Sequence, residues 1–193
     1  MRNLLSKTGT GESVVISLRQ SLTAIALTTL WFNIENHYFF SYFIFFSALL
    51  VTFRTDLEHM LIARVMTVGI VPIAFLASLL GWLPISPLEA IIGAFVGYGV
   101  LWFFRSMFYL FYKKEGIGQG DLELMAAIGA FTGPIGCWLT LTIGSIAGSC
   151  VGILLLIKQQ KTASCKLPFG SFLVLGAICY TIFKNKLVEI LFF

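Results

Sequence analysis

The sequence predicts an all-α membrane protein, a polytopic bundle of about seven transmembrane helices. Of its 193 residues, 58% are apolar and only 11% are charged, and the mean hydropathy is +0.93. A soluble domain of this size does not need so much apolar surface, so the lipid bilayer is the expected solvent. Because lipid cannot satisfy open backbone groups, we expect the spans to be helices.

Seven apolar segments predict the individual spans. They follow a polar tail at residues 1–18, which we expect to be cytosolic, and residues 19–193 are expected to form one transmembrane domain. The segments cover residues 20–33, 38–53, 63–83, 88–112, 121–133, 134–157 and 168–183. Several are shorter than the roughly 20 residues that a perpendicular span needs, so their ends are expected to be recessed.

Glycines spaced four residues apart predict close packing between some of these helices. Gly93 and Gly97 lie in the fourth segment, and Gly129 and Gly133 lie in the fifth. Small residues at this spacing form a face on which two helix backbones can approach each other. Such faces are common in membrane bundles and indicate packing rather than function.

The basic residues predict the orientation. If the N-terminus is cytosolic, eleven of the thirteen Lys and Arg residues fall at cytosolic ends of the spans, namely Arg2, Lys7, Arg19, Arg54, Arg64, Arg105, Lys113, Lys114, Lys158, Lys161 and Lys166. Lys184 and Lys186 fall outside this set. The positive-inside rule favours this topology, which requires an odd number of spans. The same topology brings Asp56 and Asp121 to the cytosolic side.

Asp56 and Asp121 are the only aspartates in the chain, and both lie at the edges of apolar segments. Asp121 ends the stretch Glu115–Asp121, which holds glycines at positions 116, 118 and 120. These glycines let a backbone, including that of a substrate, approach the acid closely. An ionisable group at such a depth in a membrane protein is by default a candidate functional residue.

Two neighbouring carboxylates favour acid–base chemistry. They cannot both ionise easily, so one keeps its proton into the neutral range. The ionised group can take a proton from water, while the protonated group can bind a peptide carbonyl and later protonate the leaving amine. Chemistry alone leaves a proton or ion pathway about as plausible as a protease, and both acids could also be merely interfacial.

Three stretches resemble the prepilin peptidases, the type IV leader peptidases among the GxGD membrane aspartyl proteases. Thr55–Leu61 resembles the first aspartate motif of that family. Glu115–Asp121, followed by Leu124, Ala126, Gly129 and Ala130, is similar to its glycine-rich second motif. Leu167–Ala177 resembles its late proline-phenylalanine-glycine stretch. The three stretches occur in the family's order, and the resemblance covers about residue 17 to the end of the chain.

The resemblance implies an enzyme of the bacterial cytoplasmic (inner) membrane, with a cytosolic N-terminus. Such an enzyme cuts the short basic leader from pilin-like precursors at the cytosolic face. By matching positions, Asp56 and Asp121 are the catalytic pair. The resemblance also implies two substrate-binding stretches: the first holds Gly116, Gly118 and Gly120, and the second is Pro168, Phe169 and Gly170. We expect no metal, cofactor or nucleic acid, and the expected partners are prepilin-like precursors and membrane lipid.

Other functions stay open beside this one. The same chemistry also suits a protease that cuts within the membrane span of its substrate. From a different class, the alternatives are a small transporter and a non-catalytic subunit of a pilus or secretion machine. A transporter should show inverted repeats and broken helices in matching halves. We find neither in the sequence. A non-catalytic subunit would tolerate the loss of either aspartate.

The chain departs from the family pattern in three ways. Ala63-Arg64 stands where the family usually has Pro-Asp, and Glu123 stands where it commonly has lysine. Glu123 adds an acid near the pair, which predicts a lower working pH, although it projects from the helix about 200° away from Asp121. The long members of the family carry a further span and a cytosolic domain, and we expect both to be absent here, where residues 1–18 form a short polar tail. We therefore expect cleavage without the N-methylation of long members, and S-adenosylmethionine only if methylation is retained.

Overall fold

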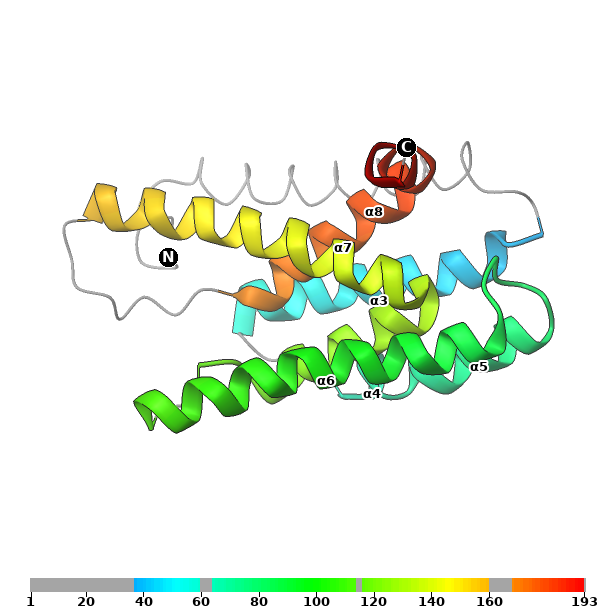
Figure 1. Ribbon diagram of the computed structural model, residues 1–193, viewed down its shortest axis with the longest axis horizontal. Helices are drawn as coiled ribbons and strands as arrows, with labels where there is room; N and C mark the ends of the chain where they lie inside the picture. Colours follow the sequence, from blue (N-terminus) through cyan, green and yellow to red (C-terminus); the bar gives the residue numbers. More distant parts are fainter. Residues whose placement is uncertain (1–36, 60–63, 114–115, 160–167, 193) are drawn as a thin grey trace.

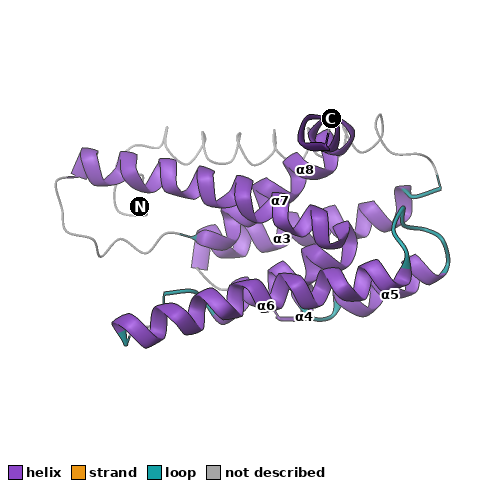
Figure 2. Cartoon of the chain, in the orientation of Figure 1, coloured by secondary structure: helices purple, strands orange, loops and turns teal. Residues whose placement is uncertain are grey.

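The computed structural model describes residues 37–59, 64–113, 116–159 and 168–192 (Figure 1). Figure 2 shows that every element in these ranges is a helix and that none of the described residues forms a strand. The elements are α3 (Phe39–His59), α4 (Arg64–Thr67), α5 (Ile70–Leu79), α6 (Pro87–Tyr112), α7 (Gln119–Gln159) and α8 (Phe169–Phe192). The all-α prediction is therefore confirmed for the described residues. The predicted tail at 1–18 and the predicted span at 20–33 lie outside them.

Three of the described helices are long and apolar enough to cross a membrane. These are Phe39–Leu57 in α3, Pro87–Tyr112 in α6 and Gln119–Leu154 in α7. Ile70–Leu79 and Phe169–Lys184 are shorter apolar helices. These lengths and compositions make the chain an integral membrane protein of helical type.

Two of the predicted segments differ from the helices that the structure forms. The second segment was predicted to end at Phe53, but α3 continues to His59, so Asp56 lies inside the helix. Hydropathy marks where a chain leaves the lipid, whereas a helix can continue as long as its backbone bonds are made. The single third segment, 63–83, is divided into α4 and α5 at Val68–Gly69.

Helix α6 follows its predicted segment closely because local signals define both of its ends. Ser86 caps the first turn through its hydroxyl, and the Glu89 carboxylate accepts the Ser86 backbone N–H at 2.8 Å. This capping box, with Pro87 in the first turn, starts the helix. Lys113 ends it in a left-handed conformation with φ of 53°.

Helix α7 is two helices joined at Gly133. This glycine has φ of 74° and ψ of 180°, and Pro134 follows it. A left-handed glycine and a proline break the helix ladder at this point, which is the predicted boundary between the fifth and sixth segments. In Figure 1 the two halves run back in opposite directions. The reversal brings the end of α7 to the same side of the bundle as its beginning.

The glycine faces pack as predicted. A Cβ on Gly93 would meet the carbonyl oxygen of Gly129, and a Cβ on Gly97 would meet that of Met125. The first half of α7 is therefore antiparallel to α6 with the two backbones in contact. On the other half of α7, Gly144 packs against Phe172 of α8 in the same manner. The core of the bundle lies around α7, which packs chiefly against α6 and α8, while Phe45 of α3 stacks on Phe131 of α7 with ring centroids 4.5 Å apart.

Candidate active site

Asp56 lies near the end of α3 and contacts the beginning of α8. Its side chain is buried, with 4% of the residue exposed. The Oδ2 atom accepts two hydrogen bonds from Ser171, from the backbone N–H at 2.6 Å and from the hydroxyl at 2.8 Å. Ser171 is the third residue of α8, where a backbone N–H has no partner inside the helix. The Asp56 carboxylate takes this role and links the two helices.

Asp121 lies in the first turn of α7 and is 9% exposed. Its Oδ2 atom accepts the backbone N–H of Gly118, the residue before the helix, at 3.2 Å. An acid at this third helical position caps a helix by the same bond as the acid of a capping box. This bond holds the Asp121 side chain against the first turn of α7.

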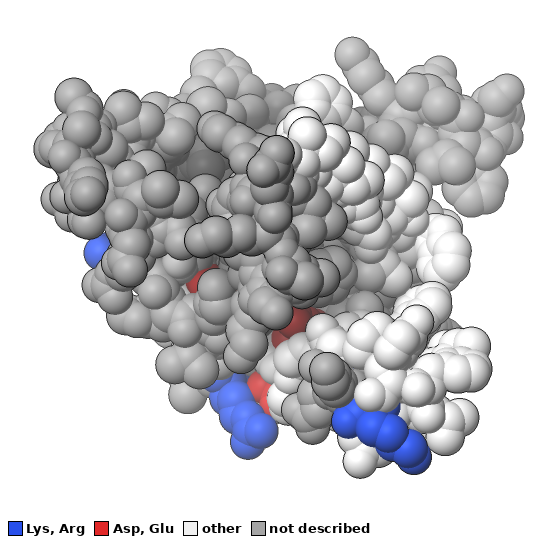
Figure 3. All heavy atoms as spheres, turned by 90° about the vertical axis from the view of Figure 1, so that its left-hand side faces the viewer, with Lys and Arg blue, Asp and Glu red and all other residues white. Residues whose placement is uncertain are grey.

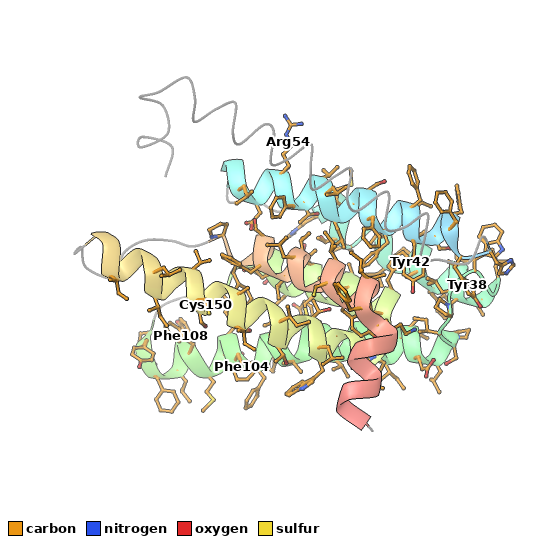
Figure 4. All side chains as sticks on the ribbon, turned by 90° about the horizontal axis from the view of Figure 1, so that it is seen from above. Tyr38, Tyr42, Arg54, Phe104, Phe108 and Cys150 are labelled. Atoms are coloured by element: carbon orange, nitrogen blue, oxygen red, sulfur yellow. The ribbon has the colours of Figure 1, made fainter. Side chains whose placement is uncertain are left out.

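The fold brings Asp56 and Asp121 to the same end of the bundle, close enough for their charges to interact. Neither aspartate forms an ion pair with any residue that the structure describes. Figure 3 looks at this end and shows Lys and Arg side chains around the acidic ones. In Figure 4, Arg54 projects from the outer side of α3 at this end. The structure thus places the two acids at the same end of the bundle, as the topology predicts.

The glycine-rich stretch before α7 packs closely against α6. A Cβ on Gly116 would lie 2.7 Å from the ring of Phe108, so only glycine fits here without a shift of the ring. Ile117 packs against the core and anchors the stretch. Gly116 and Gly118 are both exposed and leave their backbone open beside Asp121, while Gly120 is half-buried in the first turn of the helix.

Polar side chains of α6 hold Gln119, which follows Gly118 in the same stretch. The Arg105 guanidinium donates from Nη1 to Oε1 of Gln119 at 2.6 Å, and Nε2 of Gln119 donates to the Tyr98 hydroxyl at 3.3 Å. Gln119 is the first residue of α7. These bonds tie the start of α7 to α6 through side chains that can stay solvated at the membrane surface.

Glu123 is buried and has partners of its own on α4. Its Oε1 atom lies 3.3 Å from Nε of Arg64, and its Oε2 atom accepts the Thr67 hydroxyl at 3.5 Å. Arg64 and Glu123, which both depart from the family pattern, therefore form one ion pair. The prediction of a lower working pH has the wrong sign, because a second negative charge favours protonation and would move the working range upward. It also assumed an uncompensated acid at position 123. The positive charge of Arg64 offsets that acid and removes the reason for the prediction.

The third predicted stretch opens α8 directly beside Asp56. Pro168 and Phe169 are half-buried and Gly170 is buried. The residue that contacts Asp56 is the next one, Ser171, which our sequence reasoning did not single out. Its position three residues into a helix that follows a proline was an available signal.

Other acid and metal-ligand candidates add little at this end. The side chains of Glu58 and His59 lie outside those described. Among the described residues, no group of three or more His, Cys, Asp or Glu side chains is placed to hold a metal ion. The described residues at this end offer two carboxyl groups whose charges interact, beside an exposed backbone segment. Such a pair can activate a water molecule and protonate a leaving group.

Comparison with known proteins gives a consistent set of relatives. The chain matches the type IV leader peptidase family over residues 43–156. It is 36% identical over 122 residues to the prepilin leader peptidase/N-methyltransferase of Aeromonas salmonicida (strain A449), covering 63% of this chain and 41% of that protein. The protein of the same name from Pseudomonas aeruginosa is 31% identical over 121 residues, covering 63% of this chain and 41% of the relative.

A further relative extends slightly beyond this region. The prepilin leader peptidase/N-methyltransferase of Xanthomonas campestris pv. campestris is 31% identical over 135 residues, which is 69% of this chain and 46% of that protein. The chain thus spans less than half the length of these curated relatives. No solved structure matches it.

Proposed function

The chain belongs to the type IV leader peptidase family, and we propose that it is a membrane aspartyl endopeptidase with Asp56 and Asp121 as its catalytic pair. Its substrates are type IV prepilin-like precursors, from which it removes the short basic leader. One observation carries the proposal. Two buried acids from distant parts of the chain lie at one end of the bundle, close enough for their charges to interact, and neither forms an ion pair with a described residue. Burying two acids in this way costs folding free energy, and such groups are typical of catalytic sites.

The reaction follows from one proton shared by two carboxyl groups. The ionised aspartate takes a proton from water, and the resulting hydroxide adds to the carbonyl carbon of the scissile peptide. The protonated aspartate stabilises the oxyanion by a hydrogen bond. It then gives its proton to the amine nitrogen as the carbon–nitrogen bond breaks. The first aspartate now holds the proton from water, and its transfer to the other aspartate through a water molecule restores the pair.

The open glycine backbone is the proposed substrate-binding edge. Gly116 and Gly118 are exposed next to Asp121, and the backbone carbonyls and amides of an extended peptide can pair with such a segment. Gly120 keeps the turn beside the acid free of a side chain. Pro168, Phe169 and Gly170 form the opposite wall at the start of α8.

The proposed location is the bacterial cytoplasmic membrane, with the dyad and the N-terminus on the cytosolic side. Four basic residues described at the dyad end, Arg54, Arg64, Arg105 and Lys113, support this orientation because positive residues stay on the cytosolic side. The proposed seven transmembrane helices are residues 20–33, α3, α4 with α5, α6, the two halves of α7, and α8.

Cysteine labelling tests the orientation. Single cysteines at Ser86 and Lys113, both exposed at opposite ends of α6, are introduced into a variant without other cysteines. In intact cells an impermeant thiol reagent should label position 86, and position 113 should react only after the membrane is made permeable. Labelling of position 113 from outside would put the dyad on the wrong face for a leader peptidase.

Cleavage of a purified precursor tests the activity. The protein in detergent is mixed with a prepilin and S-adenosylmethionine, and the product is weighed by mass spectrometry. We expect a product that has lost the leader and carries no added methyl group. Precursors that stay intact with folded wild-type protein would contradict the proposed function. A cleaved product heavier by one methyl group would contradict only the expectation about methylation.

A further inference from the structure

The two aspartates of the dyad are held by unequal hydrogen bonding. Asp56 receives two short bonds from Ser171, at 2.6 and 2.8 Å, on the same carboxylate oxygen. Asp121 receives one longer bond, at 3.2 Å, from the backbone of Gly118. Donors stabilise the ionised form of a carboxyl group, and bonds to a charged oxygen are shorter than neutral ones. The bonds therefore favour a negative charge on Asp56.

The position of Ser171 in α8 adds to this difference. Asp56 contacts the first turn of α8, where unpaired backbone amides give the helix end a partial positive charge. Asp121 also lies at a helix start, in the first turn of α7. Among the described residues it accepts a hydrogen bond from the backbone of Gly118 and none from a side chain. Both groups are buried, so solvent does not level the difference.

We infer that Ser171 is a positioning residue that holds the negative charge of the dyad on Asp56 and so leaves the shared proton on Asp121. This inference rests on the proposed function, because it assigns roles within the same reaction. Asp56 is then the base that takes the proton from water. Asp121 is the acid that stabilises the oxyanion and protonates the leaving amine.

The competing explanation is that the Ser171–Asp56 contact only ties α3 to α8. A tie of that kind affects how much active enzyme is present or how well the substrate fits. It does not affect the pH at which the base becomes protonated. The pH dependence of cleavage therefore distinguishes a positioning role from a structural one.

Other charged groups at this end also affect such a profile and stay unchanged in the test. Among the described side chains they are Arg54 on α3, Arg64 on α4, Arg105 and Lys113 on α6, and Asp121 and Glu123 on α7.

The experiment uses a matched pair of substitutions at position 171. Ser171→Thr keeps the hydroxyl, whereas Ser171→Val has the same shape without it, and both keep the backbone N–H. Ser171→Ala removes the hydroxyl without adding volume at this buried position. For each variant, kcat/KM for a prepilin is measured across pH, and folding is checked by thermal unfolding in detergent.

Loss of the hydroxyl makes Asp56 easier to protonate, so the base is lost at a higher pH. We expect the acidic limb to move upward by about one pH unit in Ser171→Ala and Ser171→Val. Ser171→Thr should keep the wild-type limb. An unmoved acidic limb in Ser171→Ala, or a uniform loss of activity at all pH values, would overturn the inference. So would a shift of the basic limb alone. Absence of cleavage by the wild-type protein would instead refute the proposed function.

Discussion

Asp121 and Glu123 lie two residues apart near the start of α7, both buried, yet they have different neighbours. Glu123 projects toward α4, where it meets the Arg64 guanidinium and the Thr67 hydroxyl. Asp121 lies close enough to Asp56 for the two charges to interact, and its hydrogen-bond donor among the described residues is the backbone N–H of Gly118. The two acids differ little in burial and strongly in the charge that faces them.

This difference separates a structural acid from a catalytic one. A buried acid next to a cation is neutralised, and it joins two elements of the fold. A buried acid next to another acid carries a cost that packing alone does not explain, which is typical of catalytic carboxyl pairs. On this comparison we expect Glu123 to position α7, and we propose that Asp121 takes part in the reaction.

The largest expected effect comes from removing the second acid of the dyad. Asp56→Asn keeps the size of the side chain and an oxygen that can accept the Ser171 bonds, but it cannot take a proton from water. We expect kcat/KM for a prepilin to fall by at least about a thousandfold. Thermal unfolding in detergent should stay close to wild type. Substantial cleavage by a well-folded variant would show that Asp56 is not the partner of Asp121.

The next effect tests whether close packing of α6 and α7 places Asp121. Gly93→Ala drives a Cβ into the Gly129 backbone. Because backbone must move, we expect a loss of about 1–3 kcal/mol in unfolding free energy and reduced cleavage.

Gly99→Ala on the same helix is the matched control. A Cβ there meets nothing within 4 Å. We expect it to be neutral or stabilising by up to about 1 kcal/mol, since alanine favours helix over glycine. Equal unfolding temperatures for Gly93→Ala and Gly99→Ala would contradict the packing account.

A smaller effect is expected from breaking the link between α4 and α7. Arg64→Glu places a second acid beside Glu123. We expect a loss of about 1–2 kcal/mol, less than for a fully buried pair, because the Arg64 side chain is 74% exposed.

The double variant Arg64→Glu with Glu123→Arg restores opposite charges and should recover part of that stability. A double-mutant cycle on unfolding free energy measures the coupling of the pair. Additive losses in the cycle would mean that the two side chains do not interact.

The sequence was sufficient to predict the features that depend on spacing and charge. It predicted helices for the described residues, the close approach at Gly93 and Gly129, and two aspartates at one end of the bundle. These follow from hydropathy, from glycines four residues apart and from the distribution of Lys and Arg, all of which can be read along the chain.

The sequence could not predict contacts that depend on how helices meet. Ser171 and Asp56 are 115 residues apart, and a serine in an apolar segment gives no hydropathy signal. Arg64 and Glu123 each departed from the family pattern, but only the packing of α4 against α7 shows that their charges meet. The reversal of α7 depends on the backbone angles of Gly133, which the residue type permits but does not specify.

The most direct measurement compares Asp121→Asn and Glu123→Gln in one cleavage assay. Both substitutions remove a buried carboxylate from the same helical turn at nearly constant size. If the facing charge determines the role, Asp121→Asn should yield no leader-free product by mass spectrometry, while Glu123→Gln should keep substantial turnover with slightly lower stability. Retained cleavage by Asp121→Asn, or its loss in a folded Glu123→Gln variant, would contradict the assignment of the dyad.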